Sequence, residues 1–188
     1  MNDAIPKITT PYMNFYELEA LCAMGEQSYV TQKIKSYWGG MLKLGATSFW
    51  EEFDPSKSGN EHYAMYGREF GKSLCHAWGA SPIYLFGKYY LGVKPTSPGF
   101  KTYRIDPSLG GLKWMKGSVP TPNGHVSIDM NLNTIRVKAD EGTGILTIRS
   151  STPVTSTNAT VKAIAEEKYE VVVSPGKEVL INYTHVAQ

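Results

Sequence analysis

The residues that could carry chemistry gather in one segment, Thr47–Asp54, which reads TSFWEEFD. It sets two carboxylates, Glu51 and Glu52, among tryptophan and phenylalanine rings. Apolar surroundings disfavour the charged form of a carboxyl, so we expect a raised pKa that suits proton transfer. The rings, Trp50 above all, offer flat apolar faces for the C–H side of a sugar. The same pattern is also typical of a core segment whose two glutamates point to solvent.

The two glutamates cannot act as an acid/base pair with each other. Adjacent side chains point to opposite faces of a strand, or lie about 100° apart around a helix. Glycosidic cleavage needs two carboxyl groups ~5–9.5 Å apart that face each other across the bond. At most one of Glu51 and Glu52 is therefore catalytic.

Other common chemistries find little support. The four histidines, none with metal-ligand spacing, are His62, His76, His125 and His185. The Cys75-His76 pair lacks a CxxC companion, so we expect no metal site and no cofactor. Gly110-Gly111 precedes a predicted strand and indicates a turn, and no GxSxG segment offers a nucleophilic serine.

The composition excludes further classes of function. The 188 residues include 19 Lys and Arg and 17 Asp and Glu, a formal net charge of +2, which argues against nucleic acid or an acidic membrane as partner. No apolar run approaches the ~18 residues of a membrane span. The N-terminal MNDAIPKITT has no apolar core, so no signal peptide is expected there. Two cysteines cannot build a disulfide framework, and the compartment stays open.

The chain divides into two parts of different composition. Residues 1–92 hold 17 of the aromatic residues, whereas residues 93–188 hold 11 valines, the residue type that favours strands. We therefore expect a helical domain over residues 1–92 and a β-domain over residues 93–188, with Gly92–Gly99 as the connector.

Three helices are predicted in the first part. One runs over Asn14–Met24 and ends at Gly25, and the next, over Glu26–Leu42, turns back antiparallel to it. The third runs over Pro82–Leu91, with Ser81 as the N-cap.

A long segment, Gly45–Ala80, shows weak periodicity, which is typical of a functional loop. So few helices cannot bury that many aromatic rings by themselves. Either the β-domain covers them, or a partner does, or the chain is a piece of a longer protein.

The second part reads as short strands joined by turns. The predicted strands are Lys101–Ile105, Leu112–Val119, Val126–Leu132, Ile135–Val137, Gly144–Ser150, Thr160–Ile164, Lys168–Val173 and Glu178–Tyr183. Such a series is typical of an antiparallel β-sandwich. The fold class is thus α+β.

The order of several segments resembles the C-terminal region of bacterial α-L-rhamnosidases, glycoside hydrolase family 78. The segments are FYELEAL, YWGGML, GATSFWEEF, SLCHAWGASPIYLFGKYYLGVKPTSPGF and SLGGLKWMKGSVPTPNGH, within about Pro11 to Val126. The resemblance implies a catalytic toroid of paired α-helices, of which residues 1–92 are the last, incomplete part, followed by a C-terminal β-sandwich. It also implies a rhamnose-containing glycan or glycoside as partner, and a periplasmic or secreted location by analogy, with a cytoplasmic one left open.

The resemblance also implies roles for particular residues. The family inverts anomeric configuration with a general acid and a general base. Glu51 corresponds to the base, His76 to a ligand of a substrate hydroxyl with His62 as a weaker competitor, and Trp50 to a wall of the sugar site. The family's general acid lies upstream of the matching segments, so we expect this chain alone to be inactive and its uncovered helix faces to self-associate.

Two other interpretations stay open. In one, the β-domain binds carbohydrate without catalysis, through its few aromatic residues, which are Phe100, Tyr103, Trp114, Tyr169 and Tyr183. In the other, the β-domain is structural, and Trp114 and the Gly110-Gly111 loop pack on the helices.

Overall fold

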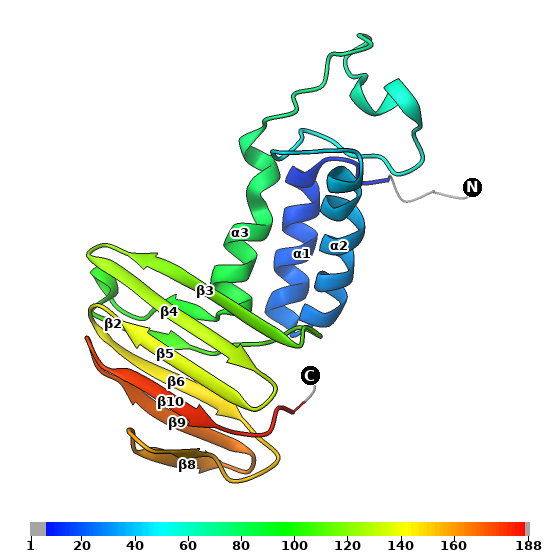
Figure 1. Cartoon of the computed structure of the whole chain (residues 1–188). Coiled ribbons are helices and arrows are strands. Elements are labelled where there is room, and N and C mark those ends of the chain that lie inside the picture. Colours follow the sequence, from blue (N-terminus) through cyan, green and yellow to red (C-terminus); the bar gives the residue numbers. More distant parts are fainter. Residues whose placement is uncertain (1–6, 187–188) are drawn as a thin grey trace. The chain divides into compact units, whose positions relative to one another are not determined.

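The computed structural model describes residues 7–186 and divides into two compact units. Of the described residues, the first unit comprises 7–25 and 29–84, and the second comprises 26–28 and 85–186. Figure 1 shows helices in the first part of the chain and strands in the second. This α+β organisation confirms the predicted fold class. The domain boundary proposed at residue 92 stays a prediction.

The first helix, α1 (Pro11–Met24), begins three residues before the predicted start. The Thr10 hydroxyl accepts a hydrogen bond from the Met13 N–H, and Pro11 occupies the first turn, where its missing N–H costs nothing. The helix ends at Gly25, as predicted. A polar cap outside the apolar pattern therefore extends the helix.

The second helix, α2 (Gln27–Lys43), follows after a tight turn and runs in the opposite direction (Figure 1). Tyr37 anchors this helix to the preceding segment, because its hydroxyl donates a hydrogen bond to the carbonyl of Thr9. That hydroxyl also accepts the N–H of Phe53, 3.1 Å away. Burial raises the pKa of Tyr37 well above its usual range.

Between residues 45 and 76 the chain is irregular, apart from a 3-10 turn at Gly59–Tyr63, as the weak periodicity predicted. A second 3-10 turn, Ala77–Ala80, leads directly into α3 (Ser81–Leu85) and a π-helical turn, Phe86–Tyr90. Ser81 itself has helical φ and ψ, and its buried hydroxyl has no partner. The predicted N-cap at Ser81 is therefore wrong, because the preceding turn already continues the helix.

The second unit contains two five-stranded sheets. One has the order β1-β2-β6-β9-β8, and the other has the order β3-β4-β5-β10-β7. The strands are β1 (Val93–Pro95), β2 (Thr102–Ile105), β3 (Trp114–Thr121), β4 (Gly124–Asn131), β5 (Thr134–Ala139), β6 (Thr143–Arg149), β7 (Thr155–Ser156), β8 (Val161–Ala165), β9 (Lys168–Val173) and β10 (Glu178–Asn182). The predicted β-sandwich is thus confirmed, with strand limits close to those read from the sequence.

Alternation along the strands builds the sandwich core. In β4, the side chains of Val126, Ile128 and Met130 are buried between exposed or half-exposed neighbours. The partner strand β5 buries Ile135 and Val137 in the same way, in register with Met130 and Ile128. Successive side chains of a strand point to opposite faces, so this pattern covers one face of the sheet.

Three features of the sandwich differ from the prediction. The short strand β7 was not among the predicted strands. Val93–Pro95, expected to belong to a connector, forms the edge strand β1, where proline is tolerated because no further strand needs its N–H. The pair β2·β6 is parallel, so the sandwich is not purely antiparallel. Within residues 7–186, no helix combines the length and the apolar character that a membrane crossing would need.

Candidate active site

Two backbone hydrogen bonds join the segment around Glu51 to the segment around His76. The Glu51 N–H donates to the carbonyl of Ser73 over 3.0 Å, and the His76 N–H donates to the carbonyl of Phe49 over 2.8 Å. The two segments therefore run antiparallel to each other. This pairing lies within the first unit and brings together two candidate residues that are far apart in the sequence.

The carboxylate of Glu51 is buried, with the residue 4% exposed, and each of its oxygens accepts a hydrogen bond. The Tyr66 hydroxyl donates to Oε1 over 2.5 Å, and the Ser73 N–H donates to Oε2 over 3.0 Å. His76 Nδ1 lies 3.9 Å from Oε2. A carboxylate has about four lone-pair sites, so these contacts leave it capacity to accept a further proton donor.

These contacts overturn one expectation from the sequence. The hydrogen bond from Tyr66 lowers the pKa of Glu51, and the Ser73 N–H and His76 act in the same direction against the effect of burial. The pKa is therefore lowered and not raised as the aromatic neighbours in the sequence suggested. The polar groups of the 63–76 loop lower the pKa of Glu51 by more than burial raises it. They therefore keep Glu51 ionised at neutral pH.

Glu52 has a separate set of partners. Its Oε2 lies 3.2 Å from the Nζ of Lys72, whose side chain is fully buried, and 3.1 Å from the Nζ of Lys57. Lys72 also donates to the carbonyl of His62. Burial opposes ionisation of Glu52, but the hydrogen bonds from Lys57 and Lys72 outweigh it and lower its pKa. The two adjacent carboxylates thus have different neighbours, in line with the argument that they do not work as a pair.

Trp78 borders the same site. Its ring lies 4.1 Å, centroid to centroid, from the ring of His76, and its indole N–H donates to the carbonyl of Glu51 over 3.1 Å. The Tyr12 ring of α1 lies 5.6 Å from that of Trp78. Both Trp78 and Tyr12 are partly exposed. Beside the carboxylate there is consequently an aromatic surface that a ligand can reach.

The two remaining candidate residues lie deeper. Trp50 is 3% exposed and packs against the ring of Tyr63, so its role as a wall of a sugar site stays a prediction. His62 is buried, and its ring stacks on that of Phe53. Of the two histidines, His76 is the one with a described interaction with Glu51. This favours His76 over His62 as the histidine of the site.

Sequence reasoning missed Tyr66 and Ser73, and it did not place Trp78 in the site. Tyr66 stands in an irregular segment with no motif around it. Ser73 contributes through its backbone N–H, which no residue type reveals. Trp78 did carry a signal, because it follows His76 by two positions in a segment already singled out. Among residues 7–186, no cluster of three His, Cys, Asp or Glu side chains could hold a metal ion.

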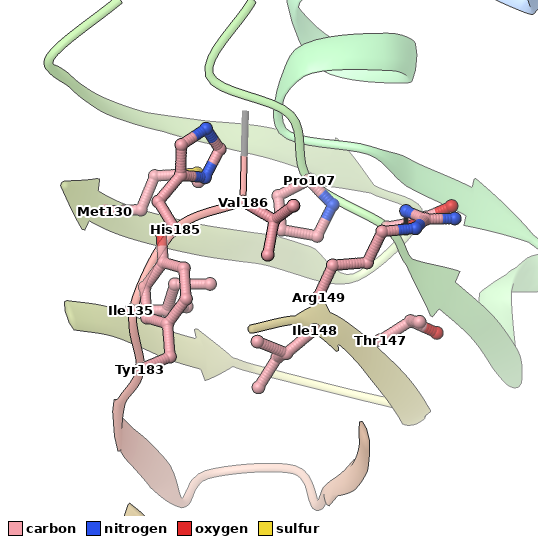
Figure 2. A pocket seen from close by; sticks show the side chains of 10 residues that line it. Pro107, Met130, Ile135, Thr147, Ile148, Arg149, Tyr183, His185 and Val186 are labelled. Atoms are coloured by element: carbon pink, nitrogen blue, oxygen red, sulfur yellow. Dashed lines mark hydrogen bonds and ion pairs between the residues drawn. The ribbon is translucent and has the colours of Figure 1, made fainter. Parts of the chain in front are cut away.

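Among the described residues of the sandwich, up to 186, two hollows are considered as ligand sites. The first, of about 20 Å³, is bordered by His185, Val186 and Arg149 in Figure 2, and this volume suits about one water molecule. The second, of about 740 Å³, is open and lined by residues of β6, β8, β9 and β10 and of the loops before β8 and β10, with no aromatic side chain among them. Neither combines the size and the aromatic lining that a pyranose ring would favour.

Known proteins resemble this chain in both sequence and fold. The α-L-rhamnosidase of Alteromonas sp. (strain LOR) is 34% identical over 99 residues, which cover 52% of this chain and 10% of that protein. The crystal structure of the GH78 family rhamnosidase of Bacillus sp. GL1 is 33% identical, with a TM-score of 0.56 over 66% of this chain and 13% of its own.

The α-L-rhamnosidase of Streptomyces avermitilis, crystallised in complex with L-rhamnose, gives a TM-score of 0.59 over 77% of this chain and 14% of its own. At 17% identity, that likeness shows the fold alone. The chain thus spans about a tenth of the curated relative and 13–14% of the two solved structures.

The sandwich also matches a family directly. Residues 92–178 match the family described as the bacterial alpha-L-rhamnosidase C-terminal domain. This match and the two relatives above 30% identity confirm the resemblance that the segment order indicated. The chain is thus similar to the C-terminal region of bacterial α-L-rhamnosidases, and these likenesses support a C-terminal rhamnosidase fragment.

Proposed function

We propose that this chain is the C-terminal part of an inverting glycoside hydrolase that releases terminal α-L-rhamnose from a glycan or glycoside. Glu51 is the general base of that reaction, and His76 binds a hydroxyl of the sugar. The observation that carries the proposal is the buried, doubly hydrogen-bonded carboxylate of Glu51 with His76 Nδ1 3.9 Å away.

The state of Glu51 suits a base. Its lowered pKa keeps it ionised at neutral pH, as the residue that removes a proton from water must be. Its two hydrogen bonds fix the carboxylate while leaving lone pairs for an attacking water. Glu52 is a poorer candidate, because the ammonium groups of Lys57 and Lys72 already occupy its carboxylate.

Aromatic side chains supply the platform for the sugar. Trp78 is partly exposed beside His76, so its indole is the one we assign to the apolar face of the ring. Trp50 is 3% exposed and packs on Tyr63, so we assign it a supporting place behind the residues that meet the sugar. Rhamnose has an apolar C–H side and a hydroxyl side, which suits an indole next to an imidazole and a carboxylate.

The reaction needs a second carboxyl group ~6.5–9.5 Å from the base, to protonate the leaving oxygen. Glu51 is the catalytic carboxyl that this chain contributes, so we place the acid in a part of the longer protein outside it. Proton donation contributes typically ~10²–10⁴-fold to such reactions. The chain by itself is therefore expected to be inactive on rhamnosides.

The test is hydrolysis of an aryl α-L-rhamnoside by the full-length protein that carries this chain. Glu51→Gln should lower kcat by about 10²–10⁴-fold, measured at a temperature where the variant is still folded, because the charged form of Glu51 also contributes to stability. Glu69→Gln is a matched control, since Glu69 is an exposed residue of the same loop region that hydrogen-bonds Asn60, and it should keep normal turnover. Full turnover in the Glu51→Gln protein would remove Glu51 from the mechanism.

A second candidate function is carbohydrate binding by the sandwich alone. Of its five aromatic residues, Tyr103 and Tyr183 are buried, whereas Trp114 is 67% exposed and could stack on a sugar. Calorimetry of the 188-residue chain with L-rhamnose, for wild type and Trp114→Ala, separates the two functions. Saturable binding that Trp114→Ala abolishes would favour the binding module.

A further inference from the structure

Tyr66, whose hydroxyl donates a hydrogen bond to the candidate base, stands in an unusual turn. Met65 and Arg68 exchange two backbone hydrogen bonds, each of 3.0 Å, so Tyr66 and Gly67 are the two central residues of a tight hairpin turn. Both have positive φ, 54° for Tyr66 and 72° for Gly67. This is the pattern of a type I′ turn, whose first central position favours Asn, Asp or Gly.

A bulky aromatic residue in that position costs backbone strain. Left-handed φ values bring Cβ too close to the following carbonyl, and such residues persist where the surrounding structure holds them. Burial of the ring does not hold Tyr66, since the residue is 70% exposed. The described contact that holds Tyr66 in this conformation is the 2.5 Å hydrogen bond from its hydroxyl to Oε1 of Glu51.

The turn belongs to a loop that holds Glu51 at two points. The loop closes on itself where the Lys72 N–H donates to the carbonyl of Tyr63 over 3.1 Å. Its tip supplies the Tyr66 hydroxyl to one carboxylate oxygen, and its end supplies the Ser73 N–H to the other. The buried Lys72, which precedes Ser73, anchors that end on Glu52. One loop thus fixes both the orientation and the charge of the carboxylate.

We propose that Tyr66 is a positioning residue for Glu51, held in a strained turn so that its hydroxyl orients the carboxylate and stabilises its negative charge. The proposal rests on the function proposed above, in which Glu51 is the general base. The groups that face the Glu51 carboxylate are Tyr66, Ser73 and His76, with the charge of Glu52 nearby. Among these groups, the Tyr66 hydroxyl is the one that a Tyr→Phe substitution removes without changing the rest of the side chain.

The first readout needs no turnover. Carboxyl ¹³C NMR of the 188-residue chain gives the titration midpoint of Glu51, whose signal is assigned by its loss in Glu51→Gln. Tyr66→Phe should raise this midpoint, because the hydrogen bond that favours the charged form is lost. Tyr29→Phe is the matched control, since Tyr29 is an exposed tyrosine of α2 in the same unit, and it should leave the midpoint unchanged.

A second variant separates positioning from mere structure. Tyr66→Asn removes the hydroxyl but suits the left-handed turn, so it should raise the Glu51 midpoint as Tyr66→Phe does and unfold at a higher temperature than Tyr66→Phe, which keeps the strain. A purely structural tyrosine would give a lower unfolding temperature and an unchanged midpoint. An unchanged Glu51 midpoint in both Tyr66 variants overturns the proposal.

The second readout is the pH–rate profile of the full-length protein. A base with a higher pKa becomes ionised only at higher pH, so the acid limb of kcat should move upward in Tyr66→Phe. A raised midpoint with an unmoved acid limb overturns the positioning role. Turnover of Glu51→Gln then decides separately whether the assignment of the base fails as well.

Discussion

The indole N–H of Trp78 donates a 3.1 Å hydrogen bond to the backbone carbonyl of Glu51, 27 positions earlier in the chain. The same indole lies against the ring of His76. One aromatic side chain therefore connects the backbone of the candidate base with the candidate substrate ligand. Trp78→Phe, which keeps a ring and loses the donor, should lower rhamnoside turnover, measured as kcat and KM on the full-length protein. A change in KM alone would limit Trp78 to sugar binding.

The buried ion pair of Lys72 and Glu52 should matter more for stability than the outer one. Lys72→Met leaves the Glu52 carboxylate with Lys57 as its remaining charged partner and should cost about 3 kcal/mol, at the low end for a broken buried pair. Lys57→Ala, at a partly exposed side chain, should cost less than about 1 kcal/mol.

Urea unfolding followed by tryptophan fluorescence measures both changes. Of the four tryptophans, Trp38, Trp50 and Trp78 lie in the first unit and so report mainly on it. Equal losses for Lys72→Met and Lys57→Ala would contradict the distinction between the inner and the outer pair.

Acid should weaken the first unit. The pKa values of Glu51 and Glu52 are lowered in the folded chain from an ordinary value of 4.5. Their contribution to stability is fully present above about pH 4.5 and is lost as the pH falls through the two lowered values. The free energy of unfolding should therefore fall below pH 4.5, and Glu51→Gln should make that fall less steep. A pH-independent free energy of unfolding between pH 5 and 3 would contradict this.

Two glycines of the sandwich unit test the effect of close packing at the same backbone conformation. Gly92 and Gly176 both have φ of 73°, but a Cβ on Gly92 would lie 2.1 Å from the carbonyl oxygen of Asp106, whereas a Cβ on Gly176 meets nothing within 4 Å. Gly176→Ala should cost about 1–2 kcal/mol from backbone strain alone. Gly92→Ala should cost about 1–3 kcal/mol more, because the backbone of Asp106 must move. Thermal unfolding by calorimetry gives both, and equal losses would refute the steric argument.

The exposed apolar residues of the first unit should make the chain self-associate. They include Met13, Tyr16, Met24, Tyr29 and Leu42, all half exposed or more. Uncovered apolar surface of this kind seeks a partner. Sedimentation equilibrium should show dimers or larger species at high concentration, with less association in Met13→Lys. A clean monomer would contradict the expectation.

The sequence predicted those elements whose pattern is local. Alternation in Val126–Met130 revealed β4, and Gly25 marked the end of α1, because each depends on neighbouring residues alone. The strand β1 was missed, since its Pro95 and the flanking Gly92, Pro98 and Gly99 indicated a connector and hid a pairing with residues 103–105. The parallel pair β2·β6 could not be predicted either, because nothing in a strand's own residues gives the direction of its partner.

The candidate site shows the same division. Glu51 and His76 were named through a resemblance over a long stretch, and the backbone pairing that joins them explains their proximity. The direction of the Glu51 pKa shift was predicted wrongly, because adjacent aromatic residues are visible in the sequence, whereas a hydroxyl 15 positions away is not. Charge at a buried site depends on groups that the fold delivers from elsewhere.

The parallel pair has a consequence for the order of folding. Thr102 of β2 pairs with Thr143 of β6, and all of β3, β4 and β5, which belong to the other sheet, lie between them in the chain. Closing a loop of about forty residues is slower than closing a hairpin. We therefore expect β3–β5 to form early as a meander, on which β10 and β7 later complete their sheet. The β1-β2 hairpin must wait for β6, so we expect the edge of β2 to stay unpaired longest and to be the site where a misfolding chain pairs with a second copy.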